Sequence, residues 1–98
     1  KNKKILGPAM PIETVTIINK LGLHARAAAL FASTAARYSS NINVGLNGKS
    51  VDAKSVMSLM LLAANQGTEI TLEVEGRDQE EAMGAIIALI NDRFNEDE

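Results

Sequence analysis

Apolar and polar residues alternate in several short stretches of the chain, which is the period of a β-strand with one buried face. Between the second and third stretches stands Asn47-Gly48, the dipeptide most typical of a two-residue hairpin turn. The polar positions of the last stretch include Glu73 and Glu75, which we place on the solvent face of the sheet. The pattern predicts strands over residues 13–18, 42–46, 49–53 and 70–75.

Three other segments carry apolar residues at the three- and four-residue spacing of amphipathic helices. The first, over residues 25–38, is rich in alanine and has high helix propensity. Ser55 can cap a short second helix that continues to about residue 64. Asp78, with Glu81 three residues later, has the pattern of a capping box at the start of a last helix that includes Phe94. We expect the acidic residues 95–98 to form a frayed tail.

The elements follow one another as strand, helix, strand, strand, helix, strand, helix. Clean alternation indicates a sheet with one covered face, so the prediction is an α+β fold, a two-layer open-faced sandwich with three helices on one face. We assign residues 12–98 to this single domain. Residues 1–11 are charged and contain Gly7-Pro8, so we expect a leader, with residues 1–9 either added for expression or part of a natural extension.

Composition narrows the function. The net charge is −2 and the chain has only three aromatic residues, which argues against a nucleic-acid-binding sheet. There is no cysteine and a single histidine, so no metal site or other cofactor is indicated. Apolar runs are too short to span a membrane, and no signal-peptide pattern is present. The expectation is a cytoplasmic domain without membrane insertion.

The histidine, His24, lies where the first strand gives way to the first helix. Free backbone N–H groups and the positive end of the helix dipole gather at such a position. Arg26 falls in the first helical turn, where a cation is mildly unfavourable, so helix stability does not explain it. Imidazole, guanidinium and backbone donors together suit a phosphoryl group carried on His24. From these residues alone, a capping or partly buried histidine remains the alternative.

The run Leu21-Gly22-Leu23-His24-Ala25-Arg26 resembles the active-site motif of the HPr family, the phosphocarrier proteins of the bacterial phosphotransferase systems that serve sugar transport. The resemblance continues through Lys54-Ser55-Val56-Met57, similar to the start of the family's second helix, and through Asn65-Gln66-Gly67-Thr68 before the last strand. It covers about residues 12–92 and implies an antiparallel sheet of order 1-4-2-3.

The resemblance implies that the Nδ1 atom of His24 accepts phosphate from a phosphoenolpyruvate-dependent first enzyme and passes it to a histidine of a downstream acceptor protein. Arg26 would stabilise the phosphate. The protein would be a reactant rather than an enzyme, without a cofactor of its own, and a monomer that meets its partners in turn. The alternative from another class is a non-phosphorylated ligand-binding or regulatory module.

Apolar residues near His24 are candidates for partner binding. The short helix after Ser55 is apolar nearly all round, so a two-layer fold must leave part of it exposed. The predicted rim consists of Leu21, Leu23, Phe31, Val56, Met57 and Met60. Periodicity alone favours core positions for at least half of these residues, which is the alternative.

Ser55 resembles the regulatory serine that HPr kinase/phosphorylase modifies in members carrying this control, which adds phosphorylation of Ser55 to its predicted role as a cap. One departure from the family pattern is Ala27, where many members have proline. It leaves open whether the chain serves the carbohydrate branch or the nitrogen-related (NPr-like) branch. Lys20-Leu21-Gly22 and the acidic tail favour either the nitrogen-related branch or the regulatory HPr proteins of Gram-negative bacteria.

Overall fold

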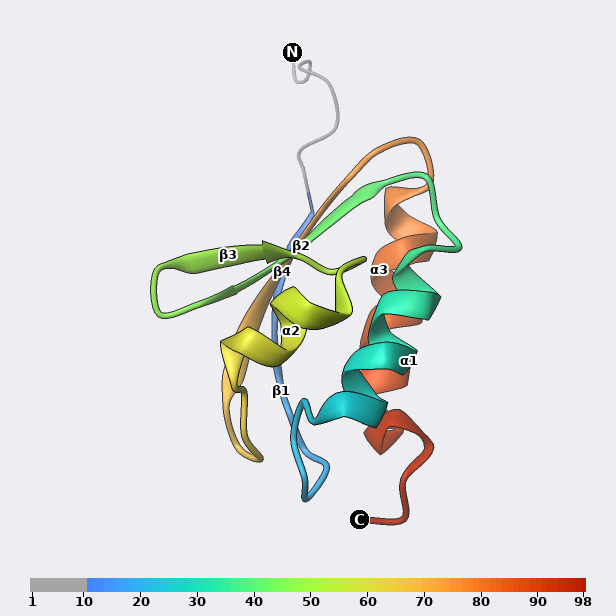
Figure 1. The fold of residues 1–98 in the computed structure, drawn as a ribbon. Coiled ribbons are helices and arrows are strands. Elements are labelled where there is room, and N and C mark those ends of the chain that lie inside the picture. Colours follow the sequence, from blue (N-terminus) through green and yellow to red (C-terminus); the bar gives the residue numbers. More distant parts are fainter. Residues whose placement is uncertain (1–10) are drawn as a thin grey trace.

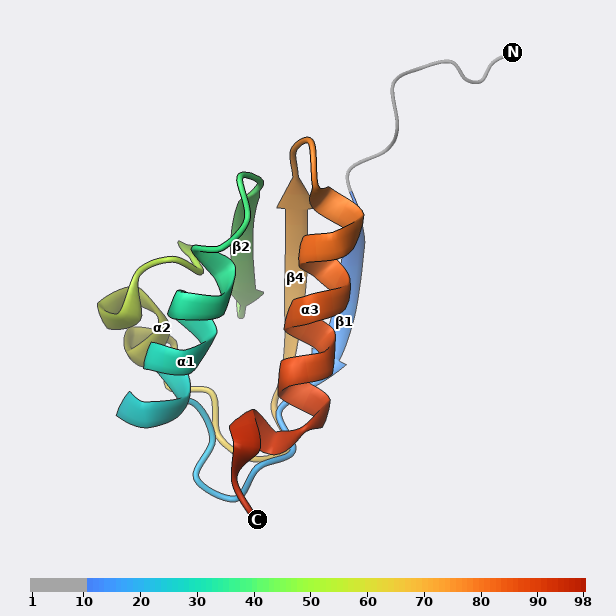
Figure 2. The ribbon, with the colours of Figure 1, turned by 90° about the vertical axis from the view of Figure 1, so that its right-hand side faces the viewer.

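The computed structural model describes residues 11–98, and most of the predicted leader lies outside this range. Four strands, β1 (Ile12–Thr16), β2 (Asn41–Leu46), β3 (Lys49–Asp52) and β4 (Glu69–Glu75), form an antiparallel sheet in the order β1-β4-β2-β3. The helices α1 (Ala25–Ala35), α2 (Val56–Leu62) and α3 (Gln79–Asn91) cover one face of it (Figures 1 and 2). Both the predicted α+β sandwich and the strand order 1-4-2-3 are confirmed.

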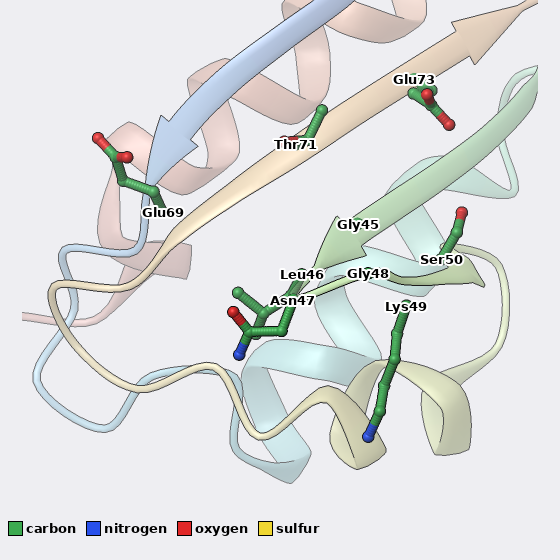
Figure 3. A pocket seen from close by; sticks show the side chains of 9 residues that line it. All are labelled: Gly45, Leu46, Asn47, Gly48, Lys49, Ser50, Glu69, Thr71 and Glu73. Atoms are coloured by element: carbon green, nitrogen blue, oxygen red, sulfur yellow. The ribbon is translucent and has the colours of Figure 1, made fainter.

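The sheet has one apolar and one polar face, as the alternation requires. Val44 of β2 pairs with Leu72 of β4, and both are fully buried beneath the helices. On the opposite face Glu73 lies between Ile12 of β1 and Asn43 of β2. Figure 3 shows a shallow hollow on this open face, which is lined mostly by glycines and by polar side chains. It contains no histidine, which separates it from the chemistry considered below.

Helix α1 meets the core largely through small side chains. In α1 the residues Ala27, Ala28 and Ala35 are fully buried, which lets the helix approach the sheet closely. It ends at Ala35, three residues before the predicted end. Helix α2 starts as predicted, because Ser55 caps it: the Ser58 N–H donates to Ser55 Oγ at 3.2 Å.

The predicted capping box of α3 is wrong, although the helix begins next to Asp78 as expected. The Asp78 side chain makes no hydrogen bond to its own helix. Its carboxylate instead accepts from the backbone N–H groups of Ser39 and Ser40, at 2.9 and 3.0 Å, and from the Ser40 hydroxyl. The segment after α1 thus competes successfully for the carboxylate.

The predicted frayed tail is also wrong, because the chain folds back after α3. Arg93, Phe94 and Asn95 all have positive φ, between 53° and 64°, in a 3-10 turn η1 (Arg93–Asn95). Left-handed backbone costs a non-glycine residue about 1–2 kcal/mol. Burial of Phe94, whose ring stacks on that of Phe31 with centroids 6.1 Å apart, offsets this cost. The turn brings the C-terminal segment beneath the start of α1 (Figure 1).

Candidate functional site

His24 is the N-cap residue of α1, as predicted. Its backbone is extended, with φ −75° and ψ 178°, and its carbonyl accepts the first helical hydrogen bond from the Ala28 N–H at 2.8 Å. The side chain makes no capping bond, and no acidic residue lies in the first turn. The imidazole is 29% exposed. The start of α1 therefore keeps backbone donors and the positive end of its dipole for an anion.

The loop that carries His24 is held against the end of α2. Gly22 has φ +66°, and a Cβ there would lie 2.4 Å from the Ala64 carbonyl oxygen, so only glycine fits. That same carbonyl accepts the Leu23 N–H at 2.9 Å. The glycine of the motif thus allows the loop to pack tightly, which fixes the position of the next-but-one residue, His24.

The side chain of Glu96, in the segment predicted to be frayed, contacts the imidazole. Its Oε2 atom forms a hydrogen bond with His24 Nε2. The other oxygen, Oε1, accepts from Asn19 Nδ2 at 3.0 Å. Asn19 is fully buried, and the same Nδ2 donates to the Gly22 carbonyl at 2.9 Å. A carboxylate that is only 11% exposed is therefore built into the site.

The surroundings of Glu96 favour its charged form. Burial raises the pKa of this carboxyl, but the hydrogen bonds from Asn19 and His24 lower it, as do the charges of His24 and Arg26. The net result is a pKa below the ordinary value. Glu96 is consequently an anion at neutral pH, and it faces the ring.

Arg26 is placed as predicted, in the first turn of α1 and beside His24. Its guanidinium is 64% exposed, and one nitrogen lies 3.6 Å from Glu96 Oε2. An ion pair this long and exposed contributes little to stability. Because the Arg26 side chain is largely exposed, its other N–H donors are accessible to an incoming anion. Lys20, Leu21 and the tail complete the wall of the hollow around His24.

The predicted apolar rim divides into exposed and buried residues. Leu21 and Met57 are 64% and 70% exposed and Met60 is 40% exposed, whereas Val56 is half-buried. Leu23 and Phe31 belong to the core, and their prediction as rim residues is wrong. Both side chains are buried, as periodicity alone favours for most of the predicted rim positions.

Leu61, 75% exposed, was missed from the rim. Met60 and Leu61 follow Met57 by three and four residues, so both lie beside Met57 on one face of α2. We call Leu21, Met57, Met60 and Leu61 the apolar surface. Ser55 lies at the opposite end of α2 from the His24 loop, and Lys54 beside it donates to the Tyr38 carbonyl at 2.8 Å.

Sequence reasoning also missed Asn19 and Glu96 as members of the site. A weak signal for Asn19 is an amide that directly follows Ile17-Ile18, at the end of the predicted strand, and precedes a loop that contains glycine. For Glu96 the signal is Phe94, an aromatic residue near the end of the chain that a frayed segment would leave exposed to water. Neither pattern names the partner that the folded chain supplies.

Comparison with known proteins gives a single family. Residues 12–92 match the family model described as the PTS HPr component phosphorylation site. The phosphocarrier protein HPr of Pseudomonas aeruginosa is 53% identical over 90 residues, which covers 91% of this chain and all of that protein.

Solved structures agree with this match. The crystal structure of HPr-C-His from Thermoanaerobacter tengcongensis superposes with a TM-score of 0.87 at 47% identity, covering 91% of this chain and all of that one. A crystal structure of an HPr dimer from the same organism has a TM-score of 0.72 at 49% identity, covering 84% and 94% of the two chains. Within residues 11–98, the helices lack the length and apolar character needed to cross a bilayer.

Proposed function

Since the chain belongs to the HPr family of phosphocarrier proteins of the phosphotransferase system, we propose that it carries a phosphoryl group on His24. The observation that carries the proposal is the placement of the imidazole at the uncapped start of α1, with Arg26 beside it. Backbone N–H groups, the helix dipole and a guanidinium all favour a dianion bound to that ring.

The chemistry is an exchange between proteins rather than catalysis by this chain. A phosphoenolpyruvate-dependent first enzyme donates the phosphoryl group to Nδ1 of His24, and a histidine of a downstream acceptor takes it. Nitrogen–phosphorus bonds on both sides keep the transfer close to balanced in free energy. Arg26 stabilises the negative charge while the group moves between partners, because the complex excludes water from the site.

We assign partner docking to the apolar surface. It combines Leu21, in the loop that precedes His24, with the exposed residues of α2. Removing exposed leucine and methionine side chains from water favours binding, and methionine adapts to more than one partner surface. A carrier that meets two partners in turn needs such a shared surface. The monomeric state and the cytoplasmic location stay predictions. One related HPr, from Thermoanaerobacter tengcongensis, is described as a dimer.

The test of the central role is replacement of the acceptor. With phosphoenolpyruvate and the cognate first enzyme, the wild-type chain should gain an acid-labile, base-stable phosphate, and His24→Ala should gain none. Circular dichroism checks that His24→Ala keeps its fold, as expected for a partly exposed residue at a helix start. Labelling of a folded His24→Ala protein would refute the proposal and leave a binding or regulatory module.

Regulation through Ser55 is the second part of the proposal. A phosphate there would add about two negative charges next to the apolar surface. Docking should weaken, and phosphorylation of His24 should slow. We expect Ser55→Asp to be labelled by the first enzyme at least tenfold more slowly, an effect of about 1.4 kcal/mol. Ser55→Asn, a neutral residue that also caps helices, is the control. Equal rates for the two variants would leave Ser55 as a helix cap alone.

A further inference from the structure

The geometry points to Glu96 as a positioning residue that holds the proton of His24 on Nε2 and so leaves the Nδ1 lone pair for attack on phosphorus. This inference rests on the proposed phosphocarrier function. It adds a role for Glu96, a residue of the C-terminal segment that the proposal does not include. Its basis is the direct contact between the Glu96 carboxylate and Nε2.

Glu96 is held in place independently of the ring. Asn19 fixes its second oxygen at 3.0 Å, and Asn19 in turn is fully buried and bonded to the Gly22 carbonyl. Burial of Phe94 two residues earlier anchors the tail beneath α1. The carboxylate is therefore already oriented before any partner arrives, which is what a positioning group needs.

A carboxylate accepts hydrogen bonds and cannot donate them when charged. Facing Nε2, it stabilises the tautomer with hydrogen on Nε2, and the other nitrogen of a neutral ring then has no hydrogen. Among the described residues, none forms a hydrogen bond with Nδ1. The nucleophilic nitrogen that the resemblance names is thus the one that carries no hydrogen in the tautomer favoured by Glu96.

The transfer step balances without moving this proton. The Nδ1 lone pair forms the new nitrogen–phosphorus bond while the bond between phosphorus and the donor atom of the first enzyme breaks, and its electron pair stays with the donor. The His24 ring becomes a phosphorylated imidazolium that still carries hydrogen on Nε2, and the Glu96 carboxylate stabilises its positive charge, as a triad aspartate does. In the donation step the same proton keeps the ring a good leaving group.

The contact of Glu96 with Arg26 does not fill the phosphate position. One guanidinium nitrogen lies 3.6 Å from Oε2, and the group is 64% exposed, so other N–H donors stay available. A carboxylate that competed with phosphate would be expected against Nδ1 and the backbone donors of α1. The structure places it on the far nitrogen of the ring.

Glu96→Gln tests the inference, because the Asn19 contact predicts how the new amide will turn. Its oxygen should stay at Asn19 Nδ2, which can only donate, so its NH₂ group should face His24 Nε2. That arrangement selects hydrogen on Nδ1, the wrong tautomer for attack. Nitrogen-15 NMR of the neutral ring should show hydrogen mainly on Nε2 in the wild type and mainly on Nδ1 in Glu96→Gln.

With the first enzyme, the rate of phosphorylation at saturating carrier should fall by about ten- to hundredfold in Glu96→Gln, the range for carboxylates that orient histidines elsewhere. The KM should change little, since the apolar surface is untouched. Asp78→Asn is the matched control, with tautomer and rate as in the wild type.

Unchanged ring tautomers would overturn the inference, as would faster transfer in Glu96→Gln, which would identify the carboxylate as a competitor of phosphate. The NMR measurement needs no phosphate donor, so it decides the role of Glu96 even if His24→Ala shows that the proposed function is wrong.

Discussion

A carboxylate contacts the segment at each end of α1: Asp78 directly precedes α3, and Glu96 follows α3 in the chain. The two carboxylates nevertheless serve different purposes. At the C-terminal end, Asp78 holds Ser39 and Ser40 through backbone N–H groups and a hydroxyl. At the N-terminal end, Glu96 holds His24, together with Asn19 and Arg26. Helices α1 and α3 lie side by side on the same face of the sheet (Figure 2).

Both carboxyl groups have a lowered pKa, so the shift alone does not separate structure from function. The hydroxyl of Ser40 and the backbone N–H groups of Ser39 and Ser40 lower the pKa of Asp78 to about 2. These donors keep their chemical state at any ordinary pH. Glu96 faces the imidazole of His24, which we propose carries the phosphoryl group. The partner, rather than the carboxylate, makes one end of α1 reactive.

Paired amide variants should separate the two ends most clearly. In Asp78→Asn a single acceptor oxygen remains for the three donors of Ser39 and Ser40. In Glu96→Gln the remaining oxygen still satisfies the one donor of Asn19. We therefore expect the larger loss in the free energy of unfolding from Asp78→Asn, measured by urea denaturation at pH 7. Equal losses would mean that the Glu96 end is as much a structural clamp as the Asp78 end.

The same pair should differ from the wild type in acid. A folded-state pKa of about 2, below the ordinary 3.8, means that the contribution of Asp78 is fully present above about pH 5 and is lost as pH falls towards 2. The unfolding free energy of the wild type should fall through this window, and that of Asp78→Asn should fall less steeply. If the unfolding free energies of the two proteins fell in parallel with pH, Asp78 would not be the group responsible for the loss. Glu96→Gln should also flatten the curve, since the Glu96 pKa is lowered too.

A smaller effect, confined to binding, is expected from Met57→Glu at the apolar surface. Placing a charge among side chains that must be desolvated should weaken binding to the first enzyme about tenfold. The free energy of unfolding should change by less than about 0.5 kcal/mol, because Met57 is 70% exposed.

Ile12→Glu is the matched control for Met57→Glu. Ile12 is also apolar and 54% exposed, but it lies on the open face of the sheet, away from the helices. Calorimetric titration should show wild-type affinity for Ile12→Glu. If both variants bind equally well, the apolar surface is not the docking site.

Local pattern predicted the elements well because each signal is short in range. The period of two set the strands, Asn47-Gly48 set the hairpin, and Ser55 set the start of α2. The positions of His24 and Arg26 at the start of α1 were predicted correctly for the same reason, since a helix start and its first turn are defined by adjacent residues. Asp78 failed as a cap because Ser39 and Ser40, distant in sequence, offered better-placed donors.

The sequence by itself determined the alternating sheet, the helix starts and the motif around His24, because hydrophobic period, capping and turn chemistry act between near neighbours. Only the tertiary structure decided that Leu23 and Phe31 are core rather than surface, and that Glu96 belongs to the site. Three left-handed residues reverse the chain there, a conformation that burial of Phe94 against Phe31 sustains. Such contacts exist only once α1, α3 and the sheet have packed together, so no local pattern contains them.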